Sequence, residues 1–180
     1  MNKRWQNSSS IELEFDECYS SWTHPRNLIE QDESFQVTSS SSLPGKDHIR
    51  VPGLAINGFH INMHKYAFFS KRIDLQGLQW WMIDLNRIIR LDFVVVILNN
   101  ETSKNSFFSG VLMRLGNSEN YFENLIIYTK SDNDYFDSVP VTMKPSNPSS
   151  GQFLSLESSF TNEKYNYLTI GELQIIEKVD

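Results

Sequence analysis

Two runs of alternating apolar and polar residues stand out along the chain, and both predict β-strands. The first covers residues 79–85 and the second covers residues 167–175. Because side chains alternate between the two faces of a strand, each run places its apolar residues on one face. Gly171 shifts the second run by one residue, and a glycine inside a strand pattern indicates a bulge. The apolar positions are Trp81, Ile83 and Leu85 in the first run, and Leu168, Ile170, Leu173 and Ile175 in the second.

Shorter apolar runs separated by polar turns predict the other strands. These are Ile11–Phe15, Phe35–Thr38, Ile88–Leu98, Gly110–Leu115, Leu125–Thr129, Val139–Met143 and Phe153–Leu156. The Ile88–Leu98 run is dense in apolar residues, as expected of a strand that is buried on both faces or crosses the middle of a sandwich. A weak helical pattern is confined to His24–Gln31, and turns are predicted at 116–118, 131–134 and 145–151. About eight or nine short strands with polar turns are typical of an all-β, antiparallel β-sandwich.

Length and charge bound the function. With 180 residues the chain is expected to form a single domain over residues 11–180, preceded by a disordered tail at residues 1–10. The net charge of −6 argues against nucleic-acid binding and makes membrane lipid an unfavourable partner. The start of the sequence lacks the apolar stretch of a signal peptide, so a cytoplasmic protein stays open beside a secreted one. Cys18 is the only cysteine, which excludes an intrachain disulfide.

No group of residues in the sequence has the spacing of a catalytic site. His60 and His64 are four residues apart, but they lie in a strand-and-loop region without the glutamate of the zinc-protease motif. Asp132 and Asp134 flank Asn133 in a polar turn that lacks the glycine and the distal glutamate of an EF-hand loop. We therefore expect a protein without enzymatic activity.

Two loops combine polar and aromatic residues in a way that suits sugar binding. Amide and charged side chains hydrogen-bond sugar hydroxyl groups, while an aromatic ring covers the apolar face of a sugar. The alternative left open is that the phenylalanines of these loops only anchor them in the core. The candidate ligand-binding residues are Lys71, Arg72 and Asp74 before the tryptophans, and Asn99, Asn100, Lys104, Asn105 and Phe107 after the central strand.

The order of several motifs resembles one known family of β-sandwiches. Five segments are similar, in order and spacing, to four strands and one turn of F-type lectins (fucolectins) and discoidin-like domains of the galactose-binding-like fold: the strands Trp80–Leu85, Val94–Asn99, Gly151–Leu154 and Leu168–Ile175, and the turn Gly53–Gly58. The resemblance implies a jelly-roll sandwich and a non-catalytic module outside the cell or on its surface that binds a glycan or glycoprotein. The alternative is a protein–protein interaction or adhesion domain on the same fold.

The sequence differs from the family at the fucose site. Fucose-binding members carry a histidine before the double tryptophan and two arginines in the loop after the central strand. In this sequence no histidine lies between His64 and Trp80, although Arg72 falls near the expected place, and the loop offers Asn100 and Phe107 where the arginines would lie. The resemblance therefore implies a glycan site that differs from the standard fucose site.

The resemblance also implies a structural calcium site. The family builds this site from carbonyl groups around a turn and from a glutamate on the last strand. Asn57 replaces the usual turn aspartate, so the site would keep one carboxylate, and a purely structural Glu172 that hydrogen-bonds the turn backbone is the alternative. The residues implied as calcium ligands are Leu54, Asn57, Phe59, Ser70, Gly171 and Glu172.

Overall fold

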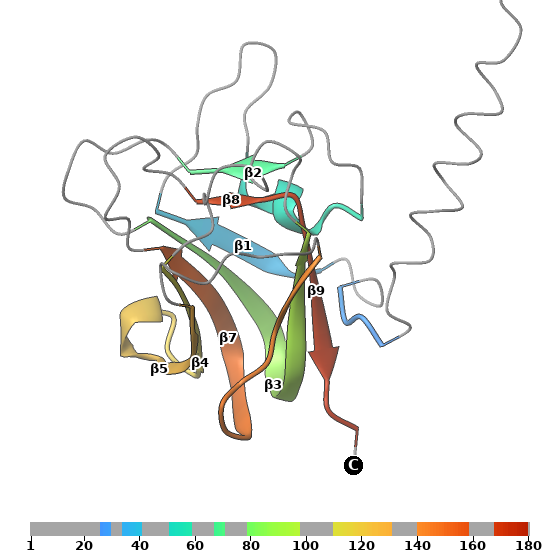
Figure 1. Cartoon of the computed structure of the whole chain (residues 1–180), viewed down its shortest axis with the longest axis vertical. Coiled ribbons are helices and arrows are strands. Elements are labelled where there is room, and N and C mark those ends of the chain that lie inside the picture. Colours follow the sequence, from blue (N-terminus) through green and yellow to red (C-terminus); the bar gives the residue numbers. More distant parts are fainter. Residues whose placement is uncertain are drawn as a thin grey trace, which may run out of the picture.

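The chain folds almost entirely into antiparallel β-sheet (Figure 1). The computed structural model describes residues 26–29, 34–40, 51–58, 67–70, 79–97, 110–130, 140–158 and 168–179. The strands are β1 (Gln36–Ser39), β2 (Phe68–Phe69), β3 (Gln79–Ile97), β4 (Val111–Gly116), β5 (Leu125–Thr129), β6 (Val141–Met143), β7 (Ser149–Ser158), β8 (Thr169–Ile170) and β9 (Glu172–Glu177), with short 3-10 turns η1 (Pro52–Ile56) and η3 (Tyr121–Glu123). The predicted all-β class is confirmed. The predicted tail and the Ile11–Phe15 strand lie outside the described residues.

One long, bent strand links the two layers of the sandwich. The sequence predicted separate strands at 79–85 and 88–98, but the structure joins them into β3, which bends near Asn86. Asn86 has a φ of 57°, and its N–H donates to Asp84 Oδ1 over 2.8 Å. Asparagine tolerates this left-handed conformation better than most residues because its short polar side chain bonds locally. The bend turns the second half of β3 back toward the end where the first half starts (Figure 1).

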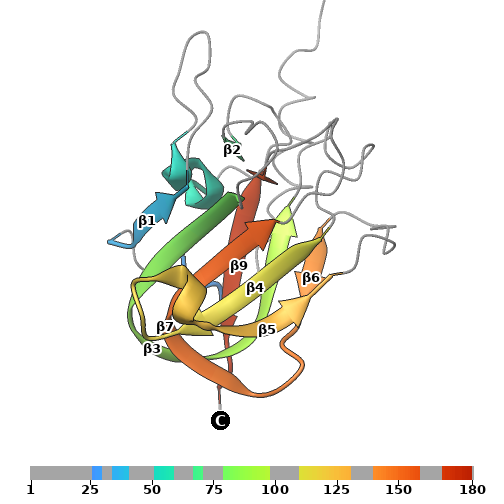
Figure 2. The same cartoon turned by 90° about the vertical axis from the view of Figure 1, so that its left-hand side faces the viewer.

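Each half of β3 builds a different layer. The first half pairs with β1 and β7, and the sheet continues through β4 to the edge strand β5. The second half pairs with β6 on one side and β9 on the other. Figure 2 shows β4, β5 and η3 in front of the layer that contains β9. The small β2–β8 sheet lies near the end where β3 starts and finishes (Figure 1).

The core lies between the layers and confirms the predicted apolar faces of both runs. Trp81, Ile83 and Leu85 of β3 are buried, and the apolar positions of the last run are all fully buried. The Trp81 indole N–H also donates to the Pro52 carbonyl over 2.9 Å, which ties η1 to the sheet. Burial of an aromatic side chain of this size is among the largest single contributions to a core.

Three sequence-based predictions about local structure were wrong or incomplete. Residues 26–29 form turns and a bridge between Asn27 and Ile176, where a weak helix was predicted. The predicted turn at 145–151 ends earlier, because Ser149–Gly151 already belong to β7 and pair with β3. At Gly171 the chain passes from β8 to β9 and changes partner from β2 to β3, a larger interruption than the predicted bulge. No helix of the described residues is long and apolar enough to span a membrane.

Candidate functional site

The bend of β3 places the attachment points of both predicted ligand loops at one end of the sandwich. Gln79, at the start of β3, aligns with Ser158, and Ser158 aligns with Val111 at the start of β4. Ile97, at the other end of β3, aligns with Glu172. The segment 71–78 enters at Gln79, and the segment 98–109 connects Ile97 to Gly110. Both segments therefore attach to strand ends at the same end of the molecule (Figure 1).

The predicted ligand-binding residues themselves lie outside the described residues, so their roles stay predictions. This holds for the whole set of Lys71, Arg72, Asp74, Asn99, Asn100, Lys104, Asn105 and Phe107.

Five of the six residues implied as calcium ligands lie on elements that pack together, and the sixth, Phe59, lies outside the described residues. Leu54 belongs to η1, and Asn57 is the C-cap residue of this turn. This turn contacts β1, β2 and β9. Ser70 follows β2, and its hydroxyl accepts the Leu168 N–H over 2.7 Å. Gly171 lies between β8 and β9, Glu172 begins β9, and the Gly171 N–H donates to the Ile97 carbonyl over 2.9 Å.

The chemistry of these donors fits a hard cation. Glu172 is 1% exposed, so its carboxylate lies in the interior, at the start of the strand that contacts η1. Carbonyl, amide and carboxylate oxygens are the ligands that calcium prefers, whereas zinc prefers histidine and cysteine. Within the described ranges no group of three or more His, Cys, Asp or Glu side chains gathers that could hold a metal. The implied donor set is thus one carboxylate with uncharged oxygens.

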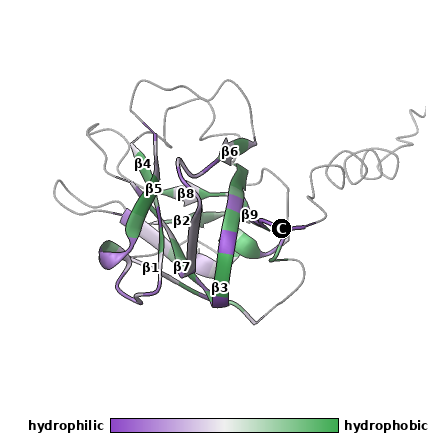
Figure 3. Ribbon diagram, turned by 90° about the horizontal axis from the view of Figure 1, so that it is seen from below, coloured by the Kyte–Doolittle hydropathy of each residue, from purple (hydrophilic) through white to green (hydrophobic). Residues whose placement is uncertain are grey.

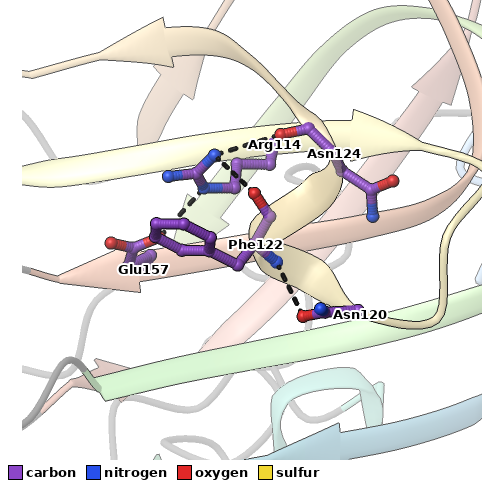
Figure 4. Close-up of polar contacts among 5 residues, drawn as sticks. All are labelled: Arg114, Asn120, Phe122, Asn124 and Glu157. Atoms are coloured by element: carbon purple, nitrogen blue, oxygen red, sulfur yellow. Dashed lines mark hydrogen bonds and ion pairs between the residues drawn. The ribbon is translucent and has the colours of Figure 1, made fainter.

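A second cluster, not expected from the sequence, lies on the outer face of the five-stranded part of the sheet (Figure 4). The Arg114 side chain from β4 reaches across to Glu157 on β7, with 2.9 Å between Nε and Oε2. Arg114 is 8% and Glu157 2% exposed, although outward-facing positions of an antiparallel sheet are usually solvated. The pair is buried because η3 folds over it.

Arg114 holds η3 in place through contacts with the main chain of this turn and with the Phe122 ring. The guanidinium Nη1 donates to the carbonyls of Asn124 over 3.0 Å and Phe122 over 3.4 Å. Its central carbon lies 5.0 Å from the centroid of the Phe122 ring, which is within cation–π range. On the other side of η3, the Tyr121 ring stacks on Trp80 with 4.9 Å between ring centroids.

One sequence signal could have located η3. Asn120 and Glu123 have the spacing of an N-cap and its reciprocal acidic partner. In the structure Asn120 Oδ1 accepts the Phe122 N–H, while the Asn120 side-chain amide donates to Glu123 over 3.0 Å. Ser118 Oγ also donates to Glu123, over 2.7 Å. These hydrogen bonds hold the pKa of Glu123 below its usual value, so its exposed carboxylate stays charged. No local sequence pattern predicts the Arg114–Glu157 pair, because the pair forms only when β4 and β7 become neighbouring strands.

Comparisons with solved structures identify the fold. No protein-family model matches the sequence, and no curated protein does. The chain is similar to a fucolectin from striped bass serum, with 16% identity and a TM-score of 0.69 over 86% of this chain and 50% of that chain. It therefore spans half the length of that chain. A fucose-binding module of Streptococcus pneumoniae gives 13% identity and a TM-score of 0.65 over 84% of this chain and 95% of the other.

A carbohydrate-binding module of another group has the same architecture. The CBM32 module of Clostridium perfringens solved with GalNAc-β-1,3-galactose gives 15% identity and a TM-score of 0.60, over 79% of this chain and 94% of that one. At such identities the similarity establishes the fold alone. The chain has the same β-sandwich fold as these lectin and CBM32 structures, as the sequence motifs predicted.

Proposed function

We propose that this protein is a non-catalytic module that binds a glycan at the end of the sandwich where β3 starts and finishes. The observation that carries the proposal is the bend of β3, which brings the attachment points of segments 71–78 and 98–109 to one end of this fold. Those segments carry the polar and aromatic residues that suit sugar binding, among them Arg72, Asn100 and Phe107.

The class of ligand is supported by what similar structures bind. By their names, the pneumococcal module binds fucose and the clostridial module was solved with GalNAc-β-1,3-galactose. A lectinolysin lectin domain with the same fold was solved with Lewis B antigen. A shallow site at a loop end, with amide and charged donors for hydroxyl groups, is the mechanism we propose. The departures at Asn100 and Phe107 favour a glycan other than one held in the standard fucose site.

A glycan array tests the proposal with variants in both segments. We expect wild-type protein to bind a defined set of glycans, and Arg72→Ala or Asn100→Ala to weaken binding about 10- to 100-fold, the loss of one or two hydrogen bonds from a charged or amide donor. Arg87→Ala is the matched control, because Arg87 lies at the bend of β3 and pairs with Glu177 at the far end of β9. It should leave glycan binding unchanged.

A blank array for the folded wild-type protein would contradict glycan binding. The protein-interaction alternative on the same fold would then replace it. Equal weakening by Arg72→Ala and Arg87→Ala would instead place the binding site away from the loop end.

We further propose that calcium stabilises the loop end through Glu172 and the carbonyl groups around it. The donor chemistry supports this, since the buried carboxylate begins β9 beside the η1 turn that carries Leu54 and Asn57. A bound cation would tie η1, the end of β2 and the start of β9 together. These are the elements next to the strand ends from which the ligand segments leave.

Thermal unfolding with calcium or with chelator tests this second proposal. Calcium at about 100 times its Kd should stabilise the wild-type protein by about 2.7 kcal/mol, because it binds only the folded state. Glu172→Gln keeps the shape of the side chain but removes the charge, so this gain should largely disappear. Glu123→Gln, on the exposed turn η3, should keep it. A wild-type protein that is equally stable in calcium and in chelator would favour the alternative, in which Glu172 has a purely structural role.

A further inference from the structure

Three aromatic rings form one continuous surface on the outer face of the five-stranded part of the sheet. Trp80 of β3 stacks on Tyr121 of η3, with 4.9 Å between ring centroids. Tyr121 in turn meets Phe122 edge to face, with 6.2 Å between centroids and an interplanar angle of 83°. Phe122 is 59% exposed, whereas Trp80 and Tyr121 are half-buried. Because each ring touches the next, we call Trp80, Tyr121 and Phe122 the aromatic surface.

The sheet beneath holds the aromatic surface in a fixed shape. Phe122 rests on the buried Arg114 guanidinium, which also binds two main-chain carbonyls of the η3 segment. Ile126 is the cross-strand partner of Arg114 and is 50% exposed, so it extends the apolar area toward β5. Figure 3 shows β5 in the hydrophobic colour at one side of the sandwich. Exposed apolar patches are often functional, and a rigid one loses little conformational entropy when it binds.

The aromatic surface begins next to the loop end of the sandwich. Gln79, where the segment 71–78 joins β3, directly precedes Trp80. Trp80 aligns with Glu157 on β7, and Glu157 aligns with Leu112 on β4. This row lies one residue inside the strand ends from which the ligand segments leave. A glycan bound at the loop end therefore reaches the aromatic surface by continuing past Trp80.

The chemistry of the aromatic surface suits a neutral sugar. An aromatic ring covers the apolar face of a sugar, and a tyrosine hydroxyl can donate to a sugar oxygen. The pKa of Tyr121 is raised, first by partial burial and then by the negative charge of Glu157, so this hydroxyl keeps its proton. The exposed charged side chains beside the rings, Glu119 and Glu123, are both acidic. They would repel an acidic sugar but not a neutral one.

We propose that the aromatic surface is a second subsite, which binds the inner, neutral sugars of an oligosaccharide whose terminal sugar is held at the loop end. The sugar next to the terminal one lies on Tyr121, and the following sugar lies on Phe122. The protein thereby distinguishes an oligosaccharide from its terminal sugar alone. This inference rests on the proposed glycan function, but it can fail while that function stands, because the loop end alone would still bind the terminal sugar.

A glycan array with paired probes tests the inference, if each neutral terminal sugar is presented both alone and as the end of a neutral tetrasaccharide. We expect wild-type protein to bind its tetrasaccharides at least about tenfold more tightly than the single sugars, a difference of about 1.4 kcal/mol. Tyr121→Leu and Phe122→Leu keep an apolar side chain but remove the flat ring. Each should abolish most of this preference and leave the binding of single sugars unchanged.

Two further variants separate ring stacking from general effects on the fold. Phe122→Tyr keeps the flat ring and should retain the preference for tetrasaccharides. Ile88→Ala is the matched control, because Ile88 is 61% exposed at the bend of β3, away from the aromatic surface. It should change the binding of neither probe.

The possible failures of the two proposals are distinguishable. Wild-type protein that binds tetrasaccharides no more tightly than single sugars would overturn the subsite and leave glycan binding at the loop end intact. A preference that survives both Tyr121→Leu and Phe122→Leu would also overturn it and place the inner sugars elsewhere. Equal weakening of both probes by these variants would mean that the rings only support the fold. A blank array for the folded wild-type protein would overturn the subsite together with the glycan proposal.

Discussion

Replacing Glu157 by leucine should destabilise the protein by about 3–5 kcal/mol, because it leaves the Arg114 guanidinium charged and buried without its partner. Arg114→Met should have a cost of similar size, since it strands the Glu157 carboxylate in the same place. The double variant should cost much less, about 1–2 kcal/mol. Two buried charges are then removed together, and only the carbonyls of Asn124 and Phe122 lose a donor.

Urea unfolding of the four proteins gives these free energies and their coupling. The matched control is the exposed pair of Arg87 and Glu177, whose removal should cost less than about 1 kcal/mol because water screens it. Additive costs for Arg114→Met and Glu157→Leu would contradict the buried pair, and would mean that η3 does not cover it in solution. Near-UV circular dichroism of the Trp80–Tyr121 stack would report any loss of η3 directly.

The sequence predicted the parts of the fold that depend on local alternation. The faces of the two long runs, the glycine that interrupts the last one, and the β5 bounds at Leu125–Thr129 all agree with the structure. In each case the side chains alternate cleanly, and one face enters the core. The order of these runs was also sufficient to indicate the galactose-binding-like fold.

The bend in β3 could not be predicted from local alternation. Residues 86–88 are exposed within a long strand, and the polar pair Asn86 and Arg87 looked like a break between two strands. β3 continues as one strand because β7 pairs with residues on both sides of its bend. Such pairing joins residues far apart in the sequence, so no local pattern contains it. The Arg114–Glu157 pair could not be predicted for the same reason. Each residue on its own fits a solvent-exposed position on a strand.

In the candidate site, too, some parts can be predicted from local motifs and others cannot. The donor residues implied for calcium could be named from motifs, since turn, glycine and glutamate keep their order in the chain, and the structure places Leu54, Asn57 and Glu172 on elements that touch. The exposure of apolar residues on β5 could not be predicted in that way. Leu125 and Ile126 belong to a strand pattern that is normally half buried, and their exposure follows from the position of β5 at the sheet edge.

Gly151→Ala should be among the most damaging single-methyl changes in the chain. A Cβ on Gly151 would lie 2.6 Å from the main-chain nitrogen and 2.7 Å from the carbonyl oxygen of Gly116. Both atoms belong to the backbone of β4, so no side-chain rotation can relieve the overlap, and the strands must separate. We expect a loss of about 3 kcal/mol, the upper part of the range for overpacked cores, and a drop in Tm of about 6–12 °C.

Gly53→Ala is the matched control. The added Cβ would meet only Val37 Cγ2, at 3.9 Å, inside the η1 turn. Alanine there restricts the unfolded chain without strain in the folded one, so stability should stay the same or rise by about 0.5 kcal/mol. If differential scanning calorimetry found the two variants alike, β7 would not pass so close to β4. The pairing of Gly151 with Ile89, which carries β7 past the bend of β3, would then lose its support. With it would go one of the pairings that place both ends of β3 at one end of the sandwich.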